Sequence, residues 1–167
     1  MAEKNTNEKR NVRNIAGVVW ELVDPIAEEL GYVIWDVEFV REGSTWYLRI
    51  TIDSDEGISI DDCEKLHRAI DAPLDEADPI EQAYTLEVSS PGIERVLKYP
   101  WHFTVFIGEE LNIRLYAPLA EAGGVKQLRA RLDAYDEDED ILHLAMGDKT
   151  IDLPREKAAA VNAAFDF

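Results

Sequence analysis

The stretch Leu86-Glu87-Val88-Ser89-Ser90-Pro91-Gly92-Ile93-Glu94-Arg95 marks the point where the chain changes its pattern. Leu86 and Val88 alternate with polar neighbours, which is typical of a half-buried strand. Pro91 presets φ at the second position of a turn, and Gly92 accepts the positive φ that the third position of a type II turn requires. We therefore expect the last strand of one unit here, followed by a sharp turn into another.

Two helices are predicted before this stretch. Apolar residues recur at helical spacing from Ile15 to Leu30, and Gly31 follows as a natural C-terminal stop. A second helix is expected to begin after Ser59, because Asp62 stands three residues further on, as in a capping box. The apolar stripe of the first helix indicates that it packs against a core.

A β-hairpin is predicted between the two helices. Residues 32–40 and 46–52 alternate in polarity on either side of a short turn. On the polar face, Arg49 is expected to pair across the strands with Asp36 or Glu38. With the strand of the opening stretch, the hairpin makes a three-stranded sheet. The residues expected on the buried face of its first strand are Val33, Trp35, Val37 and Phe39.

The chain after Tyr99 carries a different pattern, in which short stretches alternate between apolar and polar residues. Several short strands within about 55 residues suggest a small β-barrel, whose closure protects the strand edges. Residues 154–164 are expected to form a short terminal helix. The predicted fold class is therefore α+β, with an N-terminal α/β domain of two helices on a three-stranded sheet, followed by the barrel. The predicted barrel strands are 111–115, 128–134, 142–146 and 149–153.

The predicted domain organisation is a disordered N-terminal tail at residues 1–13, an N-terminal domain at 14–97 and a C-terminal barrel at 98–167. The single cysteine, Cys63, excludes an internal disulfide and fits a reducing compartment. No apolar run approaches the roughly 18 residues of a membrane helix, and the polar start of the chain lacks the apolar segment of a signal peptide. We expect a cytoplasmic monomer.

The charge of the chain is strongly acidic. It holds 35 acidic and 17 basic residues, for a formal net charge of −18. Residues 53–81 alone contain 11 acidic residues against Lys65 and Arg68. Such a field repels the phosphates of nucleic acids and favours cationic partners. A solvated helix face would account for the same cluster, and a basic protein partner is the competing interpretation.

No catalytic or metal site is predicted. The loop from Asp53 to Glu64 invites comparison with a calcium-binding EF-hand, but Gly57 occupies position five, where a ligand is required, and Ile58 the place of the invariant glycine. No serine stands in a G-x-S-x-G nucleophile elbow, and residues 121–126 lack the spacing of a phosphate-binding loop. We therefore expect no enzyme, no metal and no cofactor.

Several short strings together resemble the family of the ribosome maturation factor RimP. The longest and most specific is Tyr84-Thr85-Leu86-Glu87-Val88-Ser89-Ser90-Pro91-Gly92-Ile93-Glu94-Arg95. The chain departs from the family at Val96, where a proline is common, and at His67-Arg68, where a Ser-Arg pair is common. Shorter matches are Gly31-Tyr32, Asp36-Val37-Glu38, Asp62-Cys63, Leu74-Asp75 and Phe106-Ile107-Gly108.

The resemblance implies a two-domain assembly factor whose C-terminal domain is an SH3-like or Sm-like barrel. It implies binding to the free small ribosomal subunit, which needs the family for its maturation, and to the strongly basic small-subunit ribosomal protein twelve. The acidic charge of the chain agrees with such a partner. Ribosomal RNA is a further candidate partner, and an RNA-binding module with an Sm-like barrel is the alternative function.

The residues expected to contact a partner lie in the turn after the third strand and in an acidic loop of the barrel. In the turn, Arg95 is the residue best suited to bind a phosphate or a carboxylate. In the barrel, the acidic loop and the strand edges are expected to face a basic protein. Strand addition at one of these edges is one mode of binding. The predicted contact residues are Ser89, Ser90, Pro91, Gly92, Arg95, Asp136, Asp138 and Glu139.

Overall fold

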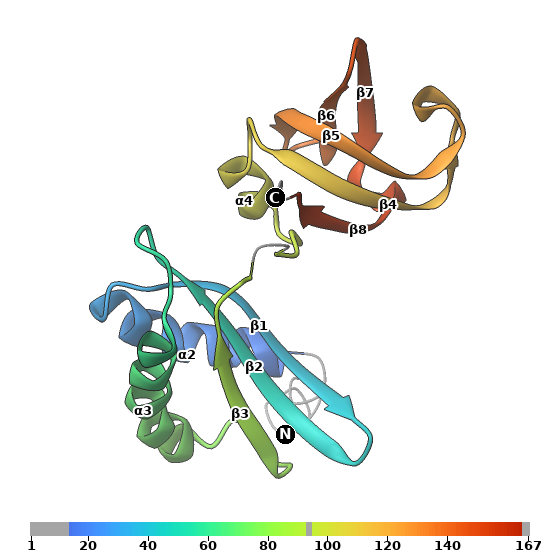
Figure 1. The fold of residues 1–167 in the computed structure, drawn as a ribbon. Helices are drawn as coiled ribbons and strands as arrows, with labels where there is room; N and C mark the ends of the chain where they lie inside the picture. The colour runs from blue at the N-terminus through green and yellow to red at the C-terminus, as the bar shows by residue number, and fades with distance from the viewer. Residues whose placement is uncertain (1–13, 93–94, 165–167) are drawn as a thin grey trace. The chain divides into compact units, whose positions relative to one another are not determined.

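The computed structural model describes residues 14–92 and 95–164, and it divides the chain into two compact units, Met1–Pro91 and Gly92–Phe167. Figure 1 shows a helix-and-sheet unit followed by a unit made mostly of strands. The tail predicted at residues 1–13 lies outside the described residues. No described helix has the length and apolar character needed to cross a membrane.

The described residues of the N-terminal unit form two helices and a three-stranded sheet, as the sequence predicts. The strands lie in the order β1-β2-β3, with β1 antiparallel to β2 and β2 parallel to β3. The parallel pair requires a crossover, and α3 supplies it. The elements are α2 (Ile15–Glu29), β1 (Val33–Glu42), β2 (Thr45–Asp53), α3 (Ile60–Ala77) and β3 (Tyr84–Ser89).

Both helices pack on one face of this sheet. Residues four apart on α2 and on α3 point into a common core with alternate residues of β2, in keeping with the helix and strand periods. The other face of β2 and β3 carries polar side chains that remain accessible. The fully buried residues of this core include Val19, Val23, Ala27, Leu48, Ile50, Ile52, Leu66 and Ile70.

The predicted buried face of β1 is wrong at its start. A β-bulge between Ile34 and Asp36 shifts the register, so that Ile34 lies opposite Ile52 and enters the core. Val33, which was expected inside, is 54% exposed. Because a bulge adds one residue to one strand, it moves the side chains before it to the other face, and simple alternation cannot foresee it.

The predicted capping box of α3 is confirmed. The Ser59 hydroxyl accepts a hydrogen bond of 3.1 Å from the Asp62 backbone N–H. In return, Asp62 Oδ2 accepts one of 2.8 Å from the Ser59 backbone N–H. Arg49, for which Asp36 or Glu38 was the expected partner, pairs with Glu42 at the end of β1 and with Glu87 on β3.

The C-terminal unit begins with a short helix and continues as a five-stranded antiparallel sheet in the order β7-β6-β5-β4-β8. The predicted strand pattern after Tyr99 is confirmed, because alternate residues of the strands are buried and the residues between them are exposed. The elements are α4 (Pro100–Val105), β4 (Glu110–Leu119), η1 (Ala120–Ala122), β5 (Val125–Asp136), β6 (Ile141–Met146), β7 (Lys149–Pro154), η2 (Arg155–Lys157) and β8 (Ala158–Ala163).

The terminal helix predicted at residues 154–164 is wrong. A single 3-10 turn, η2, is followed by strand β8, which pairs antiparallel with β4. The segment before α4 joins β8 from its other side, with Leu97 N–H donating to the Val161 carbonyl and Ala163 N–H donating to the Arg95 carbonyl, both at 2.9 Å. Alanine favours helices, so local propensity misled the prediction, and pairing on both sides of β8 outweighs it.

Candidate partner-binding surfaces

At the turn predicted after β3, the structure describes Pro91 and Gly92. Gly92 has φ +77°, the left-handed value required at the third position of a type II turn after Pro91. Ser89 ends β3 opposite Thr51 of β2, and Ser89 and Ser90 are both exposed. Ile93 and Glu94 lie outside the described residues. The turn thus presents two hydroxyl groups at the edge of the sheet, where either is able to donate or accept a hydrogen bond.

Arg95 is part of the C-terminal unit. Its backbone carbonyl accepts the hydrogen bond from Ala163, and its guanidinium carbon lies 5.4 Å from the centroid of the Phe106 ring. A guanidinium above an aromatic ring is held by the ring quadrupole, and the planar edge of a guanidinium matches the geometry of an oxyanion. Arg95 is half-buried, so its stem already contributes to packing.

The predicted acidic loop is the tip of the β5–β6 hairpin. Asp136 Oδ1 accepts a hydrogen bond of 3.1 Å from the Glu139 backbone N–H, which closes the turn. Glu137, Asp138 and Glu139 are exposed, and Asp136 is half-buried. We call these four residues the acidic hairpin tip. The structure therefore brings the predicted contact residues Asp136, Asp138 and Glu139 together on one turn.

Asp140, next to this tip, has a different role. Tyr135 Oη donates a hydrogen bond of 2.6 Å to its Oδ1, and Arg155 Nε lies 3.0 and 2.9 Å from its two oxygens. Burial alone would raise the pKa of Asp140, but the hydrogen bonds from Tyr135 and Arg155 outweigh it and hold that pKa below its ordinary value. The Asp140 carboxylate is therefore paired within the C-terminal unit, whereas the carboxylates of Glu137, Asp138 and Glu139 stay exposed.

A second acidic surface covers the C-terminal end of α3. Asp71, Asp75, Glu76 and Asp78 are exposed there, and the last turn of the helix holds no basic residue. We call these four residues the acidic helix end. Their field reaches the adjacent strand: the pKa of Tyr84 is raised, first by burial and then by the carboxylates of Asp75, Asp71 and Asp78.

The two units share the negative charge unequally. Residues 1–91 hold 21 acidic and 8 basic residues, whereas residues 92–167 hold 14 and 9. The N-terminal unit thus carries most of the negative field, and the C-terminal unit is closer to balance. In the C-terminal unit, a few basic side chains close together are therefore enough to make part of the surface locally positive.

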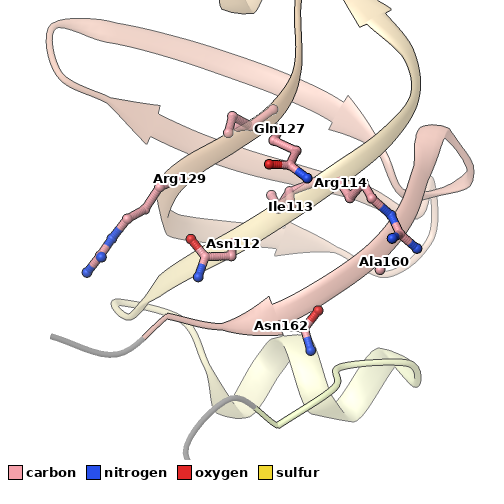
Figure 2. Close-up of a pocket in the computed structure, with 8 residues that line it drawn as sticks. Asn112, Ile113, Arg114, Gln127, Arg129, Ala160 and Asn162 are labelled. Atoms are coloured by element: carbon pink, nitrogen blue, oxygen red, sulfur yellow. The ribbon is translucent and has the colours of Figure 1, made fainter. Parts of the chain in front are cut away.

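Such a surface lies on the outer side of strands β5, β4 and β8. Cross-strand pairing places Arg129 opposite Asn112 and Asn112 opposite Asn162, and it places Arg114 opposite Gln127 in the next row. We call these five residues the polar sheet face. Figure 2 shows Asn112 between Arg129 and Asn162, with Gln127 and Arg114 beside them. They line an open depression of about 660 Å³, together with Ile113, Leu128 and Ala160.

The polar sheet face was not predicted as a site. The alternation of apolar residues at 111–115 and 128–134 already implied that Asn112, Arg114 and Arg129 point outward. What the sequence did not provide was the register of β4 on β5, or the existence of β8, which brings Asn162 into the same row. The described residues hold no group of three or more His, Cys, Asp or Glu side chains placed to bind a metal ion.

Comparison with known protein families bears on the N-terminal unit. Residues 22–94 match the family model described as the RimP N-terminal domain. These residues form a RimP N-terminal domain. The match spans the second half of α2, the three-stranded sheet, α3 and Pro91-Gly92, and it leaves out Phe106-Ile107-Gly108, on which the resemblance was also based. RimP proteins are ribosome maturation factors, and the family associates with the small ribosomal subunit, so the domain supports a role of that kind.

Proposed function

We propose that this RimP-family chain is a non-enzymatic assembly factor that binds the free small ribosomal subunit and holds a basic ribosomal protein during its maturation. The observation that carries this proposal is the RimP N-terminal domain at residues 22–94. The resemblance to the family makes small-subunit ribosomal protein twelve the candidate for the basic partner. The proposal includes a cytoplasmic monomer whose C-terminal sheet closes as an SH3-like barrel.

The acidic helix end supports a cationic partner. The C-terminus of a helix carries a partial negative charge, so carboxylates in the last turn of α3 are unfavourable by about 0.3–1 kcal/mol each. Asp75 and Glu76 stand in that turn without a basic neighbour there. Solubility does not require acids at this position, because they serve equally well elsewhere on the surface. A basic protein that docks here would relieve the repulsion.

The acidic hairpin tip is the second surface proposed for this partner. Asp138 and Glu139 are exposed and form no ion pair with another described residue, so a cationic side chain can reach them without breaking one. The turn from Ser89 to Gly92 and the Arg95 side chain are proposed to contact the subunit as well. For strand addition, β7 is the candidate edge of the C-terminal sheet, since residues 95–97 pair beside β8.

The test is a binding titration of the full-length chain against purified free small subunits and against the isolated basic ribosomal protein. Charge reversal at the acidic helix end, Asp75→Lys with Glu76→Lys, is expected to weaken both interactions. The control is Glu121→Lys with Asp148→Lys, which changes the net charge equally at two exposed positions of the other unit. Since both pairs alter long-range steering alike, only a local contact separates them.

Two results would contradict the proposal. One is failure of the wild-type chain to bind free small subunits. The other is equal weakening by the helix-end pair and by the control pair, which would mean an unspecific attraction between an acidic and a basic protein. A deletion strain provides a cellular check, because the loss of an assembly factor should cause immature small subunits to accumulate.

A further inference from the structure

The polar sheet face is unusual for so acidic a chain. Its outward-pointing positions carry two arginines and three amides, and the rows run across three neighbouring strands. The acidic side chain at its margin is Glu110, which is engaged in an ion pair with Arg129. The face therefore offers guanidinium and amide donors with a local charge opposite to that of the chain as a whole.

Arg114 stands at the centre of this face, exposed on β4 between Asn112 and Tyr116. Its side chain makes no ion pair or hydrogen bond with any other described residue. In contrast, Arg131 pairs with Asp133 at 2.7 Å, and Arg155 pairs with Asp140. An arginine whose planar donors face solvent on the outer side of a sheet is able to bind an oxyanion such as a phosphate.

An exposed aromatic ring lies next along the same strand. Tyr116 is 69% exposed, and the alternation of β4 puts it on the same outward side as Arg114. It borders a second depression of about 420 Å³, with Pro118, Glu156 and Lys157 among its lining residues. A large apolar ring left in solvent beside a cationic row is the arrangement in which a nucleobase stacks while its phosphate binds the cation.

We propose that the outer face of β5, β4 and β8 binds a short single-stranded segment of RNA, with phosphates on Arg114 and Arg129 and a base stacked on Tyr116. Asn112, Gln127 and Asn162 offer both donors and acceptors, which match base edges and the ribose 2′-hydroxyl. A carboxylate-rich peptide would use the arginines, and its backbone would pair with the amides, but it has no planar base to stack on the exposed ring. RNA is therefore the occupant that uses all three kinds of group.

The net charge of −18 opposes this contact at long range. A free polyanion would approach slowly, whereas RNA held beside a docked chain would be present at a high local concentration. The inference rests on the proposed function in this respect, because binding to the small subunit would bring the strand to the face.

The experiment measures the binding of a fluorescein-labelled oligouridine, about ten nucleotides long, to the full-length chain by fluorescence anisotropy over a range of salt concentrations. The double variant Arg114→Gln/Arg129→Gln is expected to weaken binding about tenfold or more. It should also reduce the slope of log affinity against log salt by about 1.4, because each phosphate contact to a single strand contributes about 0.7. The control, Lys65→Gln/Lys149→Gln, removes the same charge at exposed positions outside the face and should leave affinity within about twofold.

The aromatic ring is tested separately. Tyr116→Ala is expected to weaken binding about 5- to 150-fold, whereas Tyr116→Phe keeps the stacking surface and should stay within about twofold of the wild type. Equal losses for the face variant and the lysine control would overturn the inference. Displacement of the RNA by polyglutamate at equal charge concentration would also overturn it, in favour of an acidic protein partner.

Failure of this inference is distinguishable from failure of the proposed function. The variant Arg114→Gln/Arg129→Gln should still bind the isolated basic ribosomal protein, because the acidic surfaces are unchanged. If the wild-type chain binds that protein but not the oligouridine, only the inference is wrong. If it binds the oligouridine through the polar sheet face but neither the basic protein nor small subunits, the inference stands and the proposed function is wrong.

Discussion

Tyr32 Oη donates a hydrogen bond of 2.7 Å to Asp62 Oδ1, and this bond joins the residue before β1 to the first turn of α3. Asp62 thereby serves two elements, since its other oxygen closes the capping box with Ser59. The bond from Asp62 is the main cause that raises the pKa of Tyr32 to about 12, and burial adds to it. The same network holds the pKa of Asp62 below its ordinary value, with the Ser59 N–H as the main cause.

The first prediction concerns stability in alkali. The pKa of Tyr32 is about 12 in the folded chain and about 10 when unfolded, so its contribution to stability is complete below pH 10 and is lost as the pH rises toward 12. Tyr32→Phe should therefore reduce the loss of unfolding free energy over this range. Urea unfolding at several pH values, followed by fluorescence of Trp20, Trp35 and Trp46 in the N-terminal unit, measures it. An unchanged alkaline loss in Tyr32→Phe would rule out this bond as the cause.

The second prediction concerns the capping box. Ser59→Ala removes the side-chain acceptor of the Asp62 N–H and should lower the free energy of unfolding by about 1 kcal/mol. Ser59→Asp restores an acceptor at the cap position and should recover most of this loss. Ser44→Ala, in the exposed turn between β1 and β2, is the matched control and should have little effect. If Ser44→Ala lowers the free energy of unfolding as much as Ser59→Ala does, the capping box does not contribute to stability.

The third prediction compares Gly17, in the first turn of α2, with Gly31, which follows the end of the helix. Gly17 lies inside the helix, and a methyl group added there would meet nothing within 4 Å, so Gly17→Ala should stabilise the chain by about 0.5–1 kcal/mol. Gly31 has φ +86°, and its N–H donates to the Glu28 carbonyl while Tyr32 N–H donates to the Ala27 carbonyl, as in a Schellman motif. Gly31→Ala should cost about 1 kcal/mol or more. Thermal unfolding of both variants should show shifts of opposite sign.

The fourth prediction separates stability from binding at the acidic helix end. Asp75→Lys with Glu76→Lys places cations at the negative end of α3 and should raise the free energy of unfolding by roughly 0.5–2 kcal/mol at low salt. The gain should shrink as salt is added. The pKa of Tyr84 should also fall toward its ordinary value, since Asp75 is one of the groups that raise it. A variant that is less stable than the wild type would show that these acids serve the fold itself.

Much of the N-terminal unit was predictable because its determinants are local. The capping box of α3, the hairpin and the positive φ of Gly92 each depend on residues that are close in sequence. The bulge at Ile34 was not predictable in this way, because it depends on how β1 meets the core. The pairing of Arg49 with Glu87 likewise depends on the parallel register of β3, which no local pattern specifies.

The C-terminal unit and its candidate site were less predictable for the same reason. Residues 158–160 are three alanines, and their helix propensity gives no hint that they lie in β8. Without β8, the row from Arg129 through Asn112 to Asn162 does not exist, and the polar sheet face is invisible in the sequence. The acidic hairpin tip, in contrast, is contiguous in the chain and was predicted directly.

The pairing of residues 95–97 with β8 has a consequence for the order of folding. The β1–β2 hairpin closes a turn between Glu42 and Thr45, whereas Leu97 must find Val161 across almost the whole C-terminal unit. Because closing a longer loop costs more entropy and slows folding, we expect the N-terminal unit to form first, during and after synthesis. A nascent chain would then present its acidic helix end to a basic partner before Asn162 reaches Asn112. The acidic helix end would therefore be able to bind its partner before the polar sheet face has formed.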